Sequence, residues 1–420
     1  MTSRMLILAA VSLVAAPLLA GCAENGGTGG GDTPDLTLKL GTLMPLTGPL
    51  SNLGPSMQNG AKLAIQEIND ANAGLSIEVV GHEDDRTTDT AAITNTFNLL
   101  VSRGATAIAG PCCSGITASV LDLAVQNQVV VASPSATSPT LTERDNQGYF
   151  WRVPPTDAGQ GVVLAELVAA QNVTTVNMII INNDYGNGLA EVFTEYFTTS
   201  LSGVVTTTAR YDEGATEFSS QITQACVGAG SAIQGIVFVS YTADAASILR
   251  GMQAQGCLTG VQLFASEGVY DAAGSIITAA GEGPDGTSLA EGLRGTTPQP
   301  PTARFNTLYR GEFGTDPLTY SAESYDSVMY LALAALSAKS VEGPDMKEHL
   351  LRIANAPGAS CDTFARCAEL LNGGDDIDYV GMAHDLEFTD KHEPRTGAYA
   401  YWVVEDGAMT FTEENVQATD

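Results

Sequence analysis

Five short segments carry most of the residues in this sequence that could bind a small polar molecule. Two of them offer hydroxyl groups and the unpaired amides of helix N-termini: GPCCSGIT at 110–117 and SPSATSPTLT at 133–142. Such groups suit a carboxylate, because each free N–H points outward and the helix dipole favours negative charge. The other three supply an aromatic wall and one carboxylate, Glu267: NNDYGNG at 182–188, SYTAD at 240–244 and SEGVY at 266–270. Taken singly, each segment is explained equally well as a helix cap or a turn.

Each segment follows an apolar run of strand length, and the intervening sequence predicts the elements that bring the five together. Strands are expected at 36–43, 75–80, 105–110 and 128–132, with amphipathic helices at 54–73, 89–103 and 114–127. The pattern restarts with helices at 158–171 and 186–201 and strands at 176–181, 203–210, 235–240 and 261–266. This alternation predicts parallel sheets, whose ligands bind outside the carboxyl ends of the strands. We therefore predict an α/β protein with two Rossmann-like lobes and a shared site.

The remaining sequence predicts how the lobes are joined and completed. Pro154 and Pro155 cannot continue a central strand or a helix, so they are expected to form a hinge between the lobes. Further helices are expected at 301–313, 319–340 and 344–355. The stretch TGAYAYWVVEDGAMTFTE predicts a terminal β-hairpin that turns at Asp406 and Gly407.

Composition limits the classes of function. The chain has 420 residues, of which 44% are hydrophobic, enough to build two lobes. Its 48 acidic and 18 basic residues give a formal net charge of -30. No basic stripe is present, which argues against nucleic acid as a partner. The acidity indicates a well-solvated surface and is compatible with a saline habitat.

The first residues predict export. Residues 1–21 have the plan of a signal peptide, with Arg4 ahead of an apolar stretch that is too short for a permanent membrane helix. Leu19-Ala20-Gly21-Cys22 resembles the bacterial lipobox, which implies lipidation of Cys22 and attachment to a membrane at the periplasmic side or cell surface. The alternative is an ordinary signal peptide with an incidental cysteine. Residues 22–35 are Gly-rich and are expected to be a flexible tether.

Export makes disulfides plausible for the cysteines beyond Cys22. They form an even set: Cys112, Cys113, Cys226, Cys257, Cys361 and Cys367. The last two are a favoured pair on local spacing, and the middle two both end helical stretches that flank successive strands. The adjacent first two either form a disulfide between neighbouring residues or stay as thiols. Zinc is disfavoured because no C-x-x-C pair occurs.

Several motifs, in order, resemble one family over residues 36 to 405. They include GTLMPLTGPLSNLGPSMQNGAKLAIQEIN, GPCCSGIT, SPSATSPTLT, DYGNGLAEVF, FSSQI, ILRGMQAQG and ASEGV. The chain resembles the type I periplasmic solute-binding proteins of branched-chain amino acid ABC transporters. This resemblance implies two lobes around a ligand cleft. We expect residues 36–155 and 296–385 to form the N-terminal lobe, and residues 156–295 and 386–420 to form the C-terminal lobe.

The resemblance also implies which residues hold the α-carboxylate of an amino acid. The side chains of Ser114 and Thr137 are expected to contact it. Backbone groups at Ser135, at neighbouring Ala136 and near Cys113 complete the cradle. Hydrogen-bond donors are needed there because burying an unpaired charge is prohibitive.

The rest of the implied site lies around the ammonium group and the side chain of the ligand. Glu267 and Asp157 are expected to face the α-ammonium. Tyr185 and Tyr241 are expected to close over the ligand from the second lobe, and Leu53 to touch its side chain. The expected ligand is a branched-chain or other neutral L-amino acid, with an amide or another small carboxylate as the alternative. Delivery to ABC transporter permease subunits follows from the resemblance, and no cofactor is expected.

Two functions other than transport are compatible with a chain of this kind. An enzyme is disfavoured because no G-x-S-x-G or Walker-type loop occurs and all four histidines lie outside the five segments. His384, Asp385, Asp390 and His392 crowd one stretch, as metal ligands do, but a solvated turn explains them equally well and we predict no metal. A sensor that keeps this fold and docks onto a receptor is the third possibility.

Overall fold

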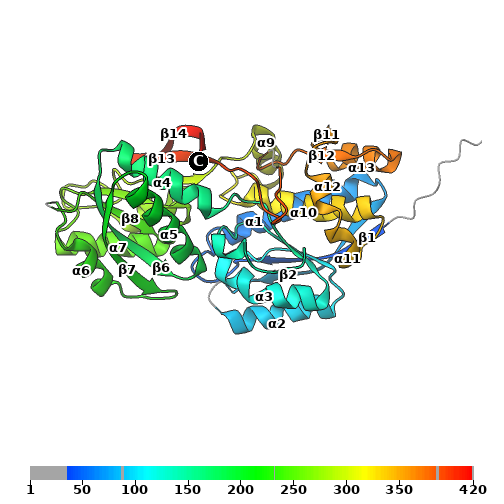
Figure 1. Ribbon diagram of the computed structural model, residues 1–420, viewed down its shortest axis with the longest axis horizontal. Coiled ribbons are helices and arrows are strands. Elements are labelled where there is room, and N and C mark those ends of the chain that lie inside the picture. Colours follow the sequence, from blue (N-terminus) through cyan, green and yellow to red (C-terminus); the bar gives the residue numbers. More distant parts are fainter. Residues whose placement is uncertain (1–35, 87–88, 231, 385–386, 419–420) are drawn as a thin grey trace, which may run out of the picture. The chain divides into compact units, whose positions relative to one another are not determined.

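The computed structural model describes residues 36–86, 89–230, 232–384 and 387–418, and it contains two large sheets (Figure 1). The predicted signal peptide, the tether and Cys22 lie outside the described residues. The first sheet has the strand order β2-β1-β3-β4-β5, and all its strands run parallel. Its strands are β1 (Leu36–Met44), β2 (Leu75–Asp84), β3 (Ala107–Ala109), β4 (Val130–Ser133) and β5 (Phe150–Arg152).

The second sheet has seven strands in the order β14-β13-β10-β9-β8-β6-β7. Five of them are parallel: β6 (Thr175–Asn182), β7 (Val204–Asp212), β8 (Gly235–Val239), β9 (Gln262–Ala265) and β10 (Arg294–Pro298). The antiparallel hairpin of β13 (Ala398–Glu405) and β14 (Ala408–Gln417) completes this sheet. Strand β6, which lies between β8 and β7, is mostly apolar and is buried from residue 176 to 181, as expected for a strand covered on both faces.

Helices connect the strands of both sheets. Those of the first half are α1 (Gly54–Ala71), α2 (Thr90–Ser102), α3 (Ser114–Asn127), α4 (Asp157–Ala170), α5 (Asp184–Thr199), α6 (Ser219–Cys226) and α7 (Thr242–Gln255). The later ones are α8 (Ser275–Ala280), α9 (Ala303–Phe313), α10 (Ser321–Ala338), α11 (Gly343–Lys347), α12 (Leu350–Ile353) and α13 (Phe364–Gly373). Helix α10 packs along α1 and is almost entirely buried, so its apolar residues form a core helix of the first lobe.

The predicted α/β class with two parallel-sheet lobes is confirmed, with differences at particular elements. The helix expected at 344–355 is wrong in part: it is divided into α11 and α12, and the His349 ring at the break bonds to Ser337 of α10 at 2.8 Å. Strands β5 and β10 were not predicted, and neither was a small sheet of β11 (Ala359–Cys361) and β12 (Ile377–Tyr379). The predicted boundary at 296 falls inside β10, and the division of the chain into lobes stays a prediction.

The chain passes between the two sheets three times. It does so after β5, between β10 and α9, and between β12 and β13. The first of these passages contains Pro154 and Pro155, the predicted hinge. Hinge motion between lobes is absorbed by the few residues that connect them, so we expect such motion to occur in these three passages.

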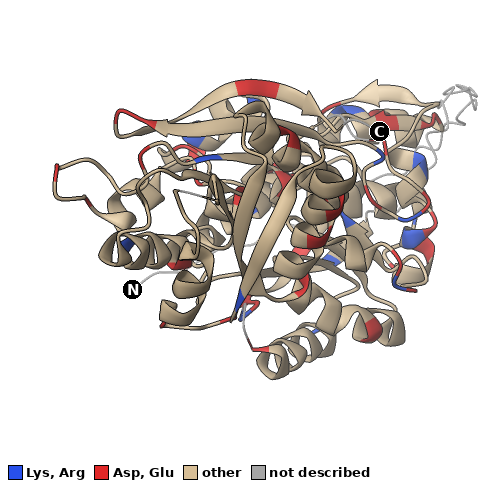
Figure 2. Ribbon diagram, turned by 60° about the vertical axis from the view of Figure 1, so that its left-hand side comes forward, with Lys and Arg blue, Asp and Glu red and all other residues tan. Residues whose placement is uncertain are grey.

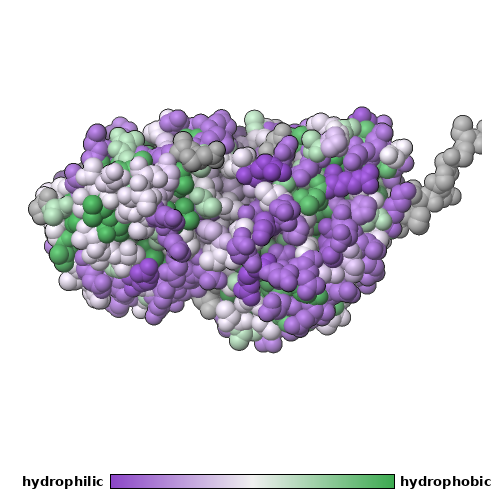
Figure 3. Space-filling model, in the orientation of Figure 1, coloured by the Kyte–Doolittle hydropathy of each residue, from purple (hydrophilic) through white to green (hydrophobic). Residues whose placement is uncertain are grey.

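The surface shows the excess of acidic over basic residues that the composition indicates (Figure 2). Figure 2 shows basic residues scattered singly among more numerous acidic ones. The face seen in Figure 3 is largely hydrophilic, with apolar residues in small groups. Among the described residues, no helix has the length and apolar character needed to cross a bilayer.

Candidate functional site

Strand ends of both sheets line a cavity of about 30 Å³. The lining residues are Leu50, Leu53, Cys112, Cys113, Ser114, Ser135, Tyr185, Tyr241, Glu267, Gly268 and Tyr320. This volume holds water but no amino acid, so a ligand can enter only when the walls separate. A larger groove of about 610 Å³ lies at the amino end of β9 and contains none of the predicted site residues.

The predicted site residues fall into two groups. Most of them line the cavity, and three do not: Ala136, Thr137 and Asp157. These three are nevertheless buried and adjacent to one another, because the Asp157 amide donates to the Thr137 carbonyl at 2.9 Å. The five strand-end segments that the sequence singled out therefore contribute to one region of the protein.

The first wall is built from the turn between β3 and α3. Gly110 has a φ of 110°, and a side chain there would lie 2.0 Å from the Leu43 carbonyl oxygen, so only glycine allows this turn to approach β1. The Cys112 amide donates to the buried carboxylate of Asp85 at 3.0 Å. Ser135 donates its hydroxyl to the Cys112 carbonyl at 2.7 Å, which joins this turn to the next loop.

The loop after β4 is held by a residue that the sequence analysis missed. Arg152 of β5 is buried and donates to the carbonyls of Ala136, at 3.2 Å, and Ser138, at 2.6 Å. It also forms an ion pair with Glu393. Its positive charge compensates two carbonyl dipoles and one carboxylate, and thereby fixes the loop that carries Ser135 and Thr137. The only signal in the sequence was a basic residue within the apolar run YFWRV.

The second wall is aromatic. The rings of Tyr185 and Tyr241 lie parallel, with centroids 5.9 Å apart. The Tyr185 hydroxyl bonds to Ser266 at 2.7 Å, and the Asn183 amide donates to the Tyr241 hydroxyl at 3.3 Å. These bonds fix the orientation of both rings, so the wall is formed before any ligand arrives.

Two buried carboxylates lie beside this wall. Glu267 accepts a hydrogen bond from Gln160 at 2.6 Å, and burial raises its pKa to about 7. Burial and then the charge of Glu267 hold the pKa of Asp157 well above its usual range. The nearby Thr137 hydroxyl lowers the pKa of Asp157 and so offsets part of this rise. Neither side-chain oxygen of Asp157 has a hydrogen-bond partner of ordinary geometry among the described residues.

Among the described residues, no Lys or Arg lines the cavity, so none of them cancels the negative potential of the carboxylate pair there. The positive charge of Arg152 lowers the pKa of Asp157, but burial and the charge of Glu267 outweigh it. A compact cation placed between Asp157 and Glu267 would restore both carboxylates to their charged form.

Tyr320 lines the cavity and was not among the predicted site residues. It precedes α10, has a φ of 67°, and its buried hydroxyl has no hydrogen-bond partner among the described residues. Tyr320 reaches the cavity from the start of a helix, whereas the predicted site residues come mainly from loops that follow strands. A polar ligand atom would satisfy this hydroxyl.

The alternative metal ligands are not brought together. His384 is buried beside Glu323 at 3.7 Å, and His392 stacks on Trp151 with ring centroids 4.5 Å apart. Asp385 lies outside the described residues. Within the described ranges, His, Cys, Asp and Glu side chains nowhere form a group of three that could hold a metal ion.

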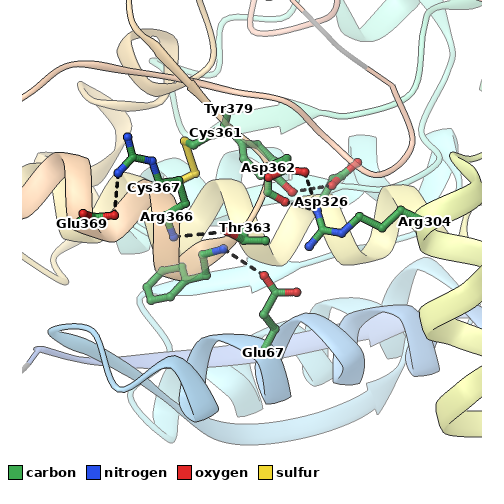
Figure 4. The surroundings of a disulfide bond; sticks show 11 residues. Glu67, Arg304, Asp326, Cys361, Asp362, Thr363, Arg366, Cys367, Glu369 and Tyr379 are labelled. Carbon is green, nitrogen blue, oxygen red and sulfur yellow. Dashed lines mark hydrogen bonds and ion pairs between the residues drawn. A yellow bond between two sulfur atoms is a disulfide. The ribbon is translucent and has the colours of Figure 1, made fainter.

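Two disulfides are present among the described cysteines, and both join the pairs favoured by the sequence: Cys226 with Cys257 and Cys361 with Cys367. Figure 4 shows the second, which links the end of β11 to helix α13. Glu67 of α1 accepts from the Phe364 amide at the start of α13, at 2.9 Å. Cys112 and Cys113 are not in a disulfide.

Residues 37–407 match the family described as periplasmic binding protein. The chain belongs to the periplasmic binding protein family. Among curated relatives, a Leu/Ile/Val-binding protein of Rhizobium johnstonii is 32% identical over 37% of this chain and 42% of its own length. The chain thus aligns with less than half of that relative. A chemotactic signal transduction system substrate-binding protein of Halobacterium salinarum is 24% identical over 88% of each chain.

Solved structures agree on the fold. A branched-chain amino acid transporter substrate-binding protein of Streptococcus pneumoniae, in complex with isoleucine, has a TM-score of 0.72. Its sequence identity is 24%, and the match covers 91% of this chain and 99% of that protein. This likeness shows that the two proteins share their fold.

Proposed function

We propose that this periplasmic binding protein captures a branched-chain or other neutral L-amino acid between its lobes and delivers it to an ABC transporter permease. The observation that carries the proposal is the pair of buried carboxyl groups of Asp157 and Glu267, which interact electrostatically beside a cavity that hydroxyl-bearing side chains also line. In this proposal the α-ammonium group pairs with these two carboxylates, and the α-carboxylate accepts hydrogen bonds from the loops at 113–114 and 135–137.

The rest of the cavity supports an apolar ligand side chain. Leu50, Leu53 and the rings of Tyr241 and Tyr320 supply most of the remaining lining. A charged side chain would be left without a partner there, at a large desolvation cost. Leucine, isoleucine and valine are therefore the first candidates, and short amides or other small carboxylates are the next.

A panel of ligands in a thermal-unfolding assay tests this assignment. At a hundred times its dissociation constant, a true ligand adds about 2.7 kcal/mol of stability to the folded protein. We expect leucine, isoleucine or valine to raise the midpoint, with a sugar and an inorganic anion as controls. A midpoint that responds to a control and to no amino acid would refute the assigned roles.

A sensor is the second candidate function, since the Halobacterium salinarum relative is named for chemotactic signalling and aligns over most of both chains. Both functions require ligand capture, and they differ in the partner that the closed form meets. Reconstituted uptake with a permease encoded beside this chain favours transport. Binding of the liganded protein to a receptor, without uptake, favours sensing.

We also propose that the protein is exported and anchored through lipid on Cys22. The lipobox resemblance supports this proposal. Membrane fractionation of the natural chain and of Cys22→Ser tests it: the natural protein should sediment with membranes, and the variant should be released. Equal retention of both would exclude the anchor.

A further inference from the structure

Cys112 and Cys113 are adjacent thiols in the wall of the cavity, and the binding proposed above does not use either sulfur. Both side chains line the cavity and are buried, with 2% and 7% of their surface exposed. The Cys112 sulfur lies 2.9 Å from the Ser135 hydroxyl oxygen and 4.0 Å from the Met57 sulfur. The other four described cysteines are joined in two disulfides.

We propose that Cys112 and Cys113 are a redox modification site, which forms a reversible disulfide between neighbouring residues and thereby weakens ligand binding. The effect on binding rests on the proposed function, whereas formation of the disulfide does not. Export supports the chemistry, because disulfides persist outside the cytoplasm.

The expected bond is a strained one. Consecutive Cα atoms across a trans peptide are about 3.8 Å apart, whereas most disulfides join Cα atoms about 4.4 to 6.8 Å apart. Closing the ring therefore has to distort the peptide between Cys112 and Cys113. Strained disulfides are reduced more readily than unstrained ones, so we expect this bond to be reversible.

The oxidant is a low-molecular-weight disulfide, and the reaction is thiol–disulfide exchange. The thiolate of one cysteine attacks the small disulfide, forms a mixed disulfide and releases one small thiolate. The second cysteine then attacks the protein sulfur of that mixed disulfide, so the Cys112–Cys113 bond forms and a second small thiolate leaves. Two electrons pass to the small disulfide, and the two cysteine protons end on the two released thiols.

Ring closure would disturb the carboxylate cradle directly. The Cys112 carbonyl accepts the Ser135 hydroxyl, and the Cys113 carbonyl accepts the Thr117 amide in the first turn of α3. Rotating the peptide between the two cysteines moves the Cys112 carbonyl group. It also moves the start of α3, the helix that carries Ser114. We expect about tenfold weaker binding, the scale for losing one hydrogen bond to a charged ligand group.

Ligand should protect the pair. In the closed arrangement, the hydrogen bond to Cys112, burial and the charge of Asp85 hold the pKa of the Cys113 thiol well above its usual value. Exchange requires a thiolate and access to solvent. Oxidation is therefore faster in the open form, and a ligand that closes the lobes should slow it.

The experiment treats the purified full chain with oxidised glutathione and follows the tryptic peptide 104–144, which contains these two cysteines and no others. We expect the peptide to lose the mass of two hydrogens, without a lasting glutathione adduct. Mild reductant should reverse the change. Leucine affinity, measured by calorimetry, should fall with oxidation and return with reduction.

Cys113→Ser is the matched control, because it keeps the Cys112 sulfur and cannot form the ring. Its affinity, whatever its starting value, should not respond to the oxidant in this way, and at most a mixed disulfide should form. Two free thiols, or a stable glutathione adduct on the natural chain, would overturn the modification site. A closed ring with unchanged leucine affinity would overturn its effect on binding. If no amino acid binds at all, the proposed function fails, while the peptide mass still decides whether the ring forms.

Discussion

Glu267 and Asp157 determine how the site responds to pH. Burial raises the pKa of Glu267 from 4.5 to about 7 and that of Asp157 well above its usual range. The folded, empty protein therefore binds more protons than the unfolded chain between about pH 4.5 and 7, so its stability should fall as pH rises through that window.

Ligand binding should favour the deprotonated form of both carboxyl groups instead. A bound ammonium group favours the charged carboxylates, so leucine should bind more weakly as pH falls below about 7. Binding near that pH should release protons, which calorimetry in buffers of different ionisation enthalpy detects. Affinity that stays constant between pH 5 and 8 would show that neither carboxyl pairs with the ligand.

Replacing Glu267 tests its role in isolation. Glu267→Gln keeps the shape of the side chain and removes the charge, and we expect leucine binding to weaken by more than about 2 kcal/mol. Ser114→Ala should cost less, because one neutral donor among several is lost. Calorimetric titration of both variants beside the natural protein gives the comparison. Unchanged affinity of Glu267→Gln would contradict the assignment.

At the scale of elements, Arg152 connects the ligand loop after β4 to the passage between β12 and β13. It donates to the Ser138 carbonyl and pairs with Glu393, so the loop and the passage move together. Its side chain is 1% exposed, which makes this pair nearly insulated from solvent.

Arg152→Met should therefore destabilise the fold by about 3 to 5 kcal/mol, since it leaves a largely buried carboxylate unpaired. Arg310→Met is the matched control, because the pair of Arg310 with Asp316 is more than half exposed and should contribute about 1 kcal/mol or less. Denaturant unfolding of the two variants measures both values. Equal destabilisation would mean that burial does not distinguish the two pairs.

The elements also show what the sequence could and could not predict. Long apolar strands such as β6 and periodic helices such as α1 were predicted almost to the residue, because local pattern and tertiary environment agree there. Strand β10 was missed, since RGTTP has no apolar alternation and is held by neighbours on both sides. Arg152 and Tyr320 were missed because long-range packing, not local sequence, brings them to the site.

At the scale of the whole molecule, a direct bond joins the two walls of the cavity. Ser138, beside β4, donates its hydroxyl to the Asp184 carbonyl at the start of α5, at 2.9 Å. A side chain at Gly188 would lie 2.8 Å from the Ser138 hydroxyl oxygen and 3.0 Å from a Pro139 ring carbon. Glycine is thus required for α5 to approach the loop.

Gly188→Val should hold the lobes apart and weaken leucine binding by about tenfold or more, although residue 188 is outside the cavity lining. Gly311→Ala is the control, because a side chain there meets open space. Small-angle scattering with saturating leucine should show a larger radius of gyration for Gly188→Val alone. Normal affinity and a normal radius would show that this contact does not limit closure.

Closure of the whole molecule around a zwitterion is the central claim, and calorimetry with three related compounds tests it most directly. Leucine carries both charges, 4-methylpentanoate lacks the ammonium group, and 3-methylbutylamine lacks the carboxylate. We predict that leucine binds and that each analogue loses more than about 2 kcal/mol. Without the ammonium group the buried carboxylates have no counter-charge, and without the carboxylate several buried hydrogen-bond donors have no acceptor. Binding of either analogue as tightly as leucine would contradict the account.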